Sequence, residues 1–123
     1  MNQMSYSVFI KDDHVYVTYS DLIDALDIVR ITKDDKFISN LRRMQKVIHD
    51  FSFADNVSLG FEDMKEIALM SNMESHFTEK AIGVIIPRTP DGYTRIQAFS
   101  QALKSPDWVV LAAKSYADAL TKI

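Results

Sequence analysis

The chain contains no cysteine among its 123 residues. It therefore forms no disulfide bond, offers no thiol nucleophile and has no thiolate ligand for a metal ion. Glycine and proline are also scarce, with three of each. No stretch has the composition of a linker, and neither the glycine-rich dinucleotide fingerprint nor a P-loop is present. A nucleotide-binding enzyme of the doubly wound type is therefore disfavoured.

A strong excess of one charge and a long apolar run are absent too. The formal net charge is −3 and the pI is near 5.5, which argues against nucleic acid as a partner. No run approaches the roughly 18 apolar residues of a membrane span. The first residues, Met1–His14, lack a basic stretch followed by a long apolar core, so we expect no signal peptide. The expected location is the cytoplasm, and no cofactor is indicated.

Hydrophobic residues make up 47% of the chain, enough to bury the core of a single domain. Three short apolar runs stand out, namely Lys46–Phe51, Ala81–Pro87 and Trp108–Ala112. Such runs are typical of strands covered on both faces, and the amphipathic patterns that follow them predict parallel pairing. Tyr6–Ile10 and Val15–Tyr19 flank a short polar turn and predict an antiparallel hairpin. The expected fold class is α/β, with a mixed sheet of about five strands and about four helices.

Apolar spacing and capping residues predict the helices. They are expected to begin at Ser20 or Asp21, to span about Gly60–Met73, to begin at Thr89-Pro90, and to begin after Ser115, with Asp118 in a capping-box position. Lys33–Gln45 is ambiguous, because Phe37, Leu41 and Met44 form a helical stripe while Ile31-Thr32 and nearby charges indicate a break. We expect a loop with one short helical turn there, then a strand over about Met44–Phe51 and a polar connection over Ser52–Ser58.

Four segments fit a known pattern, namely Val47–Ser52 (VIHDFS), Ala81–Pro87 (AIGVIIP), Ser115–Leu120 (SYADAL) and the acidic Lys33–Phe37 (KDDKF). With the order of elements around them, they resemble the STAS-like family, in particular its small stand-alone SpoIIAA-like bacterial proteins. The resemblance covers nearly the whole chain as a pattern of element types. It implies a non-enzymatic regulatory module that binds a partner protein. The family's relation to CRAL-TRIO-type domains implies, as the alternative, carriage of a small hydrophobic or lipid-like ligand.

The resemblance also points to one serine. Regulatory STAS domains carry a phosphorylatable serine in a D-S-S-G-like turn before the second long helix. The corresponding turn here is Asp55–Gly60 (DNVSLG), in which Ser58 is the nearest candidate but lacks the preceding aspartate. The alternative interpretation is that Ser58 begins or caps a helix.

His49, Asp50 and Ser52 invite a catalytic interpretation, but the geometry of a strand argues against it. Neighbouring strand residues point to opposite faces, so His49 and Asp50 cannot act together. We expect Asp50 to accept backbone N–H bonds from the following loop, and His49 to be half-buried and bonded to a neighbour. The three histidines are far apart with no ligand spacing, so neither a catalytic residue nor a metal site is predicted.

Asp50, Arg88 and Thr89 are expected to share one edge of the sheet. The carboxyl ends of parallel strands meet there, and ligands bind there in open α/β sheets. Arg88 would also lie beside the start of the helix at Thr89, where free N–H groups favour an anion. An anionic ligand or a partner carboxylate is one prediction, and a surface ion pair of Arg88 with Asp50 or Asp91 is the alternative.

Two further surfaces are candidates. Methionines and phenylalanines after Ser58 could form the movable wall of an apolar pocket or pack as ordinary core. A basic cluster at Arg42-Arg43 and Lys46 could touch anionic lipid at a membrane surface, although interleaved aspartates favour a solvated face. A homodimer through an exposed sheet edge or helix face is a further expectation. The pocket candidates are Phe61, Met64, Met70, Met73 and Phe77.

Overall fold

The computed structural model describes residues 6–24, 30–31, 34–58, 81–89, 91–102 and 108–123. In these ranges the order of elements is strand, strand, strand, helix, strand, strand, strand, helix, strand, helix. The elements are β1 (Tyr6–Ile10), β2 (Val15–Tyr19), β3 (Asp21–Asp24), α2 (Asp35–Met44), β4 (Lys46–Asp50), β5 (Ala54–Ser58), β6 (Ala81–Ile86), α4 (Asp91–Ala102), β7 (Trp108–Ala112) and α5 (Tyr116–Leu120).

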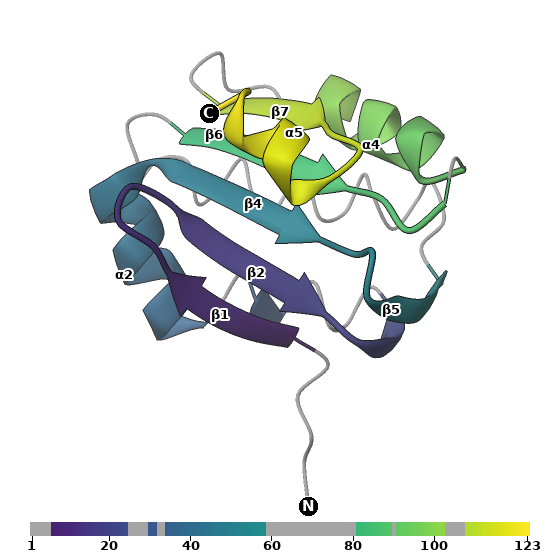
Figure 1. The fold of residues 1–123 in the computed structure, drawn as a ribbon, viewed down its shortest axis with the longest axis horizontal. Helices are drawn as coiled ribbons and strands as arrows, with labels where there is room; N and C mark the ends of the chain where they lie inside the picture. The colour runs from purple at the N-terminus through teal and green to yellow at the C-terminus, as the bar shows by residue number, and fades with distance from the viewer. Residues whose placement is uncertain (1–5, 25–29, 32–33, 59–80, 90, 103–107) are drawn as a thin grey trace, which may run out of the picture.

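The main sheet has five strands in the order β1-β2-β4-β6-β7. β1 and β2 form the antiparallel hairpin expected from the sequence, and β2, β4, β6 and β7 all run parallel. The two expected properties of the sheet, a hairpin at one edge and parallel apolar strands beyond it, are confirmed. Figure 1 shows α5 in front of this sheet and α2 and α4 behind it.

Each face of the sheet has its own hydrophobic cluster. α2 packs against β1 and β2 on one face, where Val17, Val47 and Phe37 are buried together. α5 packs against β4 and β6 on the other face, over Ile48 and Val84. Burying one such side chain fully contributes roughly 1.5–3 kcal/mol, so the two clusters provide much of the driving force for the fold.

The segment expected to be mostly loop forms a full helix, α2. The Asp34 side chain caps it by accepting a hydrogen bond from Phe37 N at 3.2 Å. Phe37 and Leu41 bury its inner face, and Gln45 ends it in a left-handed conformation with φ of 61°. The cap and the buried stripe outweigh the β-branched pair before it. The expectation of a loop with one helical turn was therefore wrong.

The helix expected from Ser20 or Asp21 is also absent over Asp21–Asp24, which instead form strand β3. β3 pairs in parallel with β5, part of the expected polar connection Ser52–Ser58, in a small two-stranded sheet. Figure 1 shows this sheet beyond the carboxyl ends of β2 and β4. Residues 25–29 lie outside the described part of the chain, so the rest of that expected helix is not tested.

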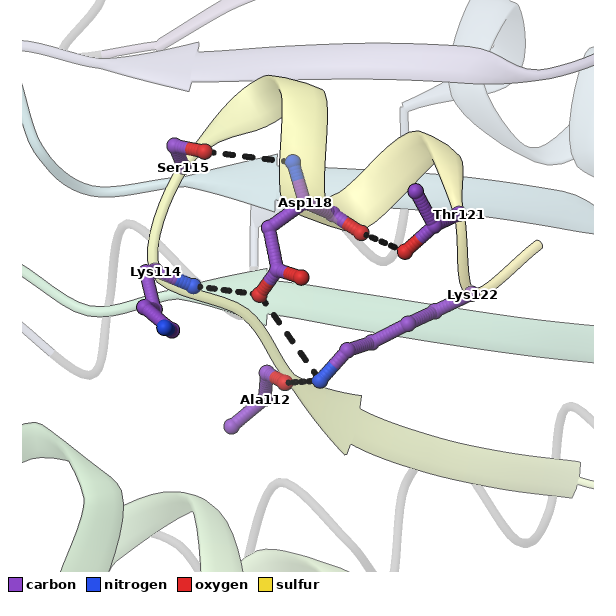
Figure 2. A network of polar contacts seen from close by, with 6 residues as sticks. All are labelled: Ala112, Lys114, Ser115, Asp118, Thr121 and Lys122. Atoms are coloured by element: carbon purple, nitrogen blue, oxygen red, sulfur yellow. Dashed lines mark hydrogen bonds and ion pairs between the residues drawn. The ribbon is translucent and has the colours of Figure 1, made fainter.

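The last helix begins as the sequence predicts. Ser115 Oγ accepts a hydrogen bond from Asp118 N at 3.1 Å, and Asp118 Oδ2 accepts one from Lys114 N at 3.0 Å (Figure 2). The acidic side chain thus reaches back to the residue before the cap, a variant of the capping box. The helix after Thr89 is α4, which starts at Asp91. The helix expected over Gly60–Met73 lies outside the described residues.

Candidate functional site

The carboxyl ends of β4 and β6 form one edge of the sheet, as predicted. Phe51 N donates to Ile86 O at 2.9 Å, which holds the two strand ends together. Arg88, just past β6, donates from Nε to Ala54 O at 2.8 Å and so joins this edge to the start of β5. Among the described contacts Arg88 has no ion pair with Asp50, and the side chain of Asp91 is not described.

Asp50 is the last residue of β4 and is only 3% exposed. Its Oδ1 accepts hydrogen bonds from Ser52 N at 2.9 Å and Ser52 Oγ at 2.5 Å. Its Oδ2 accepts a hydrogen bond from the Tyr16 hydroxyl at 2.6 Å. Burial and the adjacent carboxylate raise the pKa of Tyr16 above its usual value. The expectation that Asp50 binds the N–H of the following loop is confirmed, whereas the bond from Tyr16 was not expected.

His49 lies on the opposite face from Asp50, as strand geometry requires. Its Nδ1 is 2.8 Å from the Tyr19 hydroxyl, and its ring packs beside Tyr19 and Phe37. Desolvation in this aromatic setting lowers the pKa of His49 to about 4. The expected half-buried histidine bonded to a neighbour is confirmed, and the ring is neutral at pH 7.

A second polar network, not found from the sequence, joins the hairpin turn to α5. His14 is buried, with Nδ1 2.7 Å from Asp13 Oδ1 and Nε2 2.8 Å from the Tyr116 hydroxyl. The hydrogen bond with His14 lowers the pKa of Asp13, and burial raises that of Tyr116. Tyr116 also packs on Tyr16, with ring centroids 4.4 Å apart. The raised pKa of Tyr116 argues against its use as a nucleophile, so we assign this network to holding α5 on the sheet.

Two exposed aromatic residues flank the same edge and were not singled out in the sequence. Phe53, in the turn between β4 and β5, is 64% exposed, and Tyr93, in the first turn of α4, is 42% exposed. We call Phe53, Arg88 and Tyr93 the carboxyl rim. No sequence signal could have identified Phe53, because the segment that contains it appeared to be only a polar connection.

The remaining predicted residues are placed less fully. Thr89 is half-buried and its carbonyl accepts a hydrogen bond from Gly92 N at 2.9 Å, in the turn that leads into α4. Ser58 ends β5, and its side chain is not described. The five pocket candidates, which are Phe61, Met64, Met70, Met73 and Phe77, lie outside the described residues, so the pocket remains a prediction.

The basic cluster is engaged within the chain. Arg43 Nη2 donates to Asn40 Oδ1 at 2.7 Å, and Lys46 Nζ lies 3.8 Å from Asp13 Oδ2. Across the described ranges there is no group of three side chains that could hold a metal ion. The described helices include none that is both long and apolar enough to cross a membrane.

The comparisons with known proteins bear on the fold. No family model matches the chain, and no curated protein matches it. A solved structure of the anti-sigma factor antagonist SpoIIAA in its unphosphorylated form is similar, with a TM-score of 0.58 and 11% sequence identity. The match covers 95% of this chain and 96% of that one. It gives no support to the relation with CRAL-TRIO-type domains. The chain therefore has the STAS fold of the SpoIIAA type.

Proposed function

We propose that this chain is a non-enzymatic regulatory module that binds a partner protein through the carboxyl rim. The SpoIIAA structure that it resembles is that of an anti-sigma factor antagonist, a name that describes action on another protein. At 11% identity the likeness concerns the fold, so the surface has to be argued from this chain's own residues.

The observation that carries the proposal is the exposure of Phe53 beside Arg88. Phe53, at a strand end, is 64% exposed and belongs to neither of the two described hydrophobic clusters on which the fold depends. Aromatic residues and arginine are enriched where protein interfaces concentrate their binding energy. Phe53 and Arg88 therefore have the side-chain chemistry of an interface centre.

The backbone beneath the rim is held rigidly, which favours binding. Asp50 fixes Ser52 through two hydrogen bonds, and Arg88 fixes Ala54 through its Nε. Phe53 is thus held between two anchored residues. Because ordering an interface loop costs free energy on binding, a turn that is already ordered loses less of the contact energy. Arg88 uses only Nε among its described contacts, which leaves its Nη atoms for a carboxylate on the partner.

The arrangement argues against an enzyme. His49 and Asp50 lie on opposite faces, and the Asp50 carboxylate already accepts three hydrogen bonds within the chain. Ser52 Oγ donates to that carboxylate. The described histidine on this face, His14, bonds to Tyr116 and precedes Val15, which pairs with Val47 at the opposite end of β4 from Asp50. His14 is therefore not placed to act as the base of Ser52. The alternative of a hydrophobic ligand depends on Met64, Met70 and the residues around them, and gains no support from the described part of the chain.

The test is a paired capture experiment. Purified protein serves as bait in an extract of the organism that makes it, next to a Phe53→Ala bait and a Phe9→Ala bait. Phe9 is a matched control, since it is an exposed phenylalanine on β1, at the opposite side of the sheet from β7. We expect one partner protein on the wild-type and Phe9→Ala baits that is lost from the Phe53→Ala bait. Equal recovery on all three baits would contradict the proposed surface.

A further inference from the structure

The two edge strands of the main sheet are β1 and β7, and a lysine from a helix end binds an outward carbonyl on each. On β1, Lys11 N donates a hydrogen bond to His14 O, so these two residues form a hydrogen-bonded pair. Hydrogen-bonded and non-hydrogen-bonded pairs alternate along an antiparallel hairpin, and this bond fixes which pairs are which. It makes Val8 a non-hydrogen-bonded partner of Val17, so the backbone groups of Val8 point away from β2. Lys36 Nζ, from α2, donates to Val8 O at 3.0 Å.

On β7 the same arrangement is built from the C-terminal residues. Ala113 N donates to Ile85 O at 3.0 Å, so in this parallel ladder the backbone groups of Val110 and Ala112 point away from β6. Lys122 Nζ donates to Ala112 O at 2.8 Å, and Asp118 Oδ2 lies 3.8 Å from the same ammonium (Figure 2). Lys122 therefore occupies an acceptor that a further strand would need.

The residues of β7 itself include none of the kinds that discourage pairing with another strand. Its sequence, WVVLA, holds no charge and no proline, and Val109 and Leu111 are 44% and 38% exposed on the face that carries α5. An exposed apolar edge strand is a template for pairing with another chain unless something covers or charges it. In the described part of the chain, no strand pairs with the outer edge of β7.

The strand that fits this edge best is β7 of a second copy. Antiparallel pairing about a two-fold axis at Val110 would place Val109 of each copy opposite Leu111 of the other, on one face of a continuous sheet. Two five-residue strands bury less area than the roughly 1,200 Å² of a standard stable interface, so the pairing is weak and a single lysine can prevent it.

We propose that the edge of β7 is a self-pairing surface that Lys122 holds closed against a second copy of this chain. Lys122→Met keeps the aliphatic stem but removes the ammonium that binds Ala112 O. Asp118→Asn removes the charge that holds Lys122 in place, so it should also increase self-association, but less than Lys122→Met does. Lys114→Met is the matched control, because Lys114 is an exposed lysine beside β7 whose ammonium makes no described bond to a β7 carbonyl, although its charge, like that of Lys122, acts on Asp118.

A proline at Val110 shows whether β7 is the pairing strand. The N–H of Val110 points away from β6, so proline there removes the outward donor without removing a bond of the sheet. Sedimentation velocity over a concentration series measures association, and circular dichroism melts confirm that each variant folds. We expect Lys122→Met to self-associate at least about tenfold more strongly than wild type and Lys114→Met, and the Lys122→Met, Val110→Pro double variant to be monomeric.

Two results would overturn the proposal. One is a folded Lys122→Met variant that associates no more than Lys114→Met at any soluble concentration. The other is a double variant that associates as strongly as Lys122→Met alone, since pairing would then use another surface.

Discussion

The Tyr16 hydroxyl, on β2, donates a hydrogen bond of 2.6 Å to Asp50 Oδ2 at the end of β4. Tyr16 pairs with Ile48 and Thr18 pairs with Asp50, so this is a diagonal contact on the face that carries α5. The bond supplies a donor to a buried carboxylate and ties the hairpin to the strand end from which the carboxyl rim emerges.

Tyr16→Phe should therefore cost about 1.5–3 kcal/mol of unfolding free energy, since it leaves one oxygen of a buried charge without its donor. Urea denaturation at pH 7 measures the loss as a lower midpoint with unchanged slope. Asp50→Asn in both backgrounds completes a double-mutant cycle. A coupling energy near zero would mean that the hydroxyl and the carboxylate do not stabilise each other.

His49 makes the stability depend on pH. Its folded pKa of about 4 is below the usual 6.5, so the unfolded chain binds the proton more tightly. The contribution of the neutral His49 ring to the free energy of unfolding is fully present above about pH 6.5, and it is lost as the pH falls through about 4. The expected loss from His49 is about 2 kcal/mol between pH 7 and pH 5. Urea unfolding at both values should show it in wild type and not in His49→Gln, which lacks the titrating ring. Equal losses in the two proteins would contradict this assignment.

Gly92 allows the first turn of α4 to approach Pro87. A Cβ at Gly92 would lie 2.5 Å from Pro87 Cβ, so Gly92→Ala forces the helix away and should cost about 1–3 kcal/mol, despite the usual preference of helices for alanine. Gly83→Ala is the matched control, because its Cβ would meet Val47 Cγ1 at an ordinary 3.7 Å. Thermal melts compare the two variants, and a Gly92→Ala protein at least as stable as Gly83→Ala would contradict the close approach.

The main sheet could be predicted from the sequence because three of its strands coincide with short apolar runs. Lys46–Phe51, Ala81–Pro87 and Trp108–Ala112 are short, largely apolar runs of the kind that parallel strands covered by helices show, and the observed strands differ from them by a residue or less at each end. Ser115 likewise marked the start of α5, because a local hydrogen bond decides a helix cap.

The errors fall where local pattern and tertiary pairing disagree. Leu22-Ile23 suits a helix or a strand, and pairing with β5 decided for a strand. β5 itself contains Asp55, Asn56 and Ser58, which sequence alone gives no reason to place in a sheet. In α2 the β-branched pair Ile31-Thr32 and the nearby charges favoured a break over the apolar stripe that begins at Phe37, and the cap at Asp34, which decides for a helix, was not used in that interpretation.

The candidate site was predictable only in its location. Parallel topology places the ends of β4 and β6 together, and so correctly puts Asp50 and Arg88 at one edge. Their partners, Tyr16 and Ala54, are 34 residues away from them along the chain in both cases, and no short-range pattern specifies such contacts. The exposure of Phe53 depends on the course of the turn before β5, which the sequence also leaves open.

The most direct test of the carboxyl rim is the dissociation constant of the partner recovered in the capture experiment. Isothermal titration calorimetry would compare wild type with Phe53→Ala and Phe9→Ala, after melts show that all three fold alike. If the rim is the binding surface, Phe53→Ala weakens binding by at least about tenfold, or about 1.4 kcal/mol, and Phe9→Ala changes it little. Unchanged affinity for Phe53→Ala, or an equal loss for Phe9→Ala, would contradict the account.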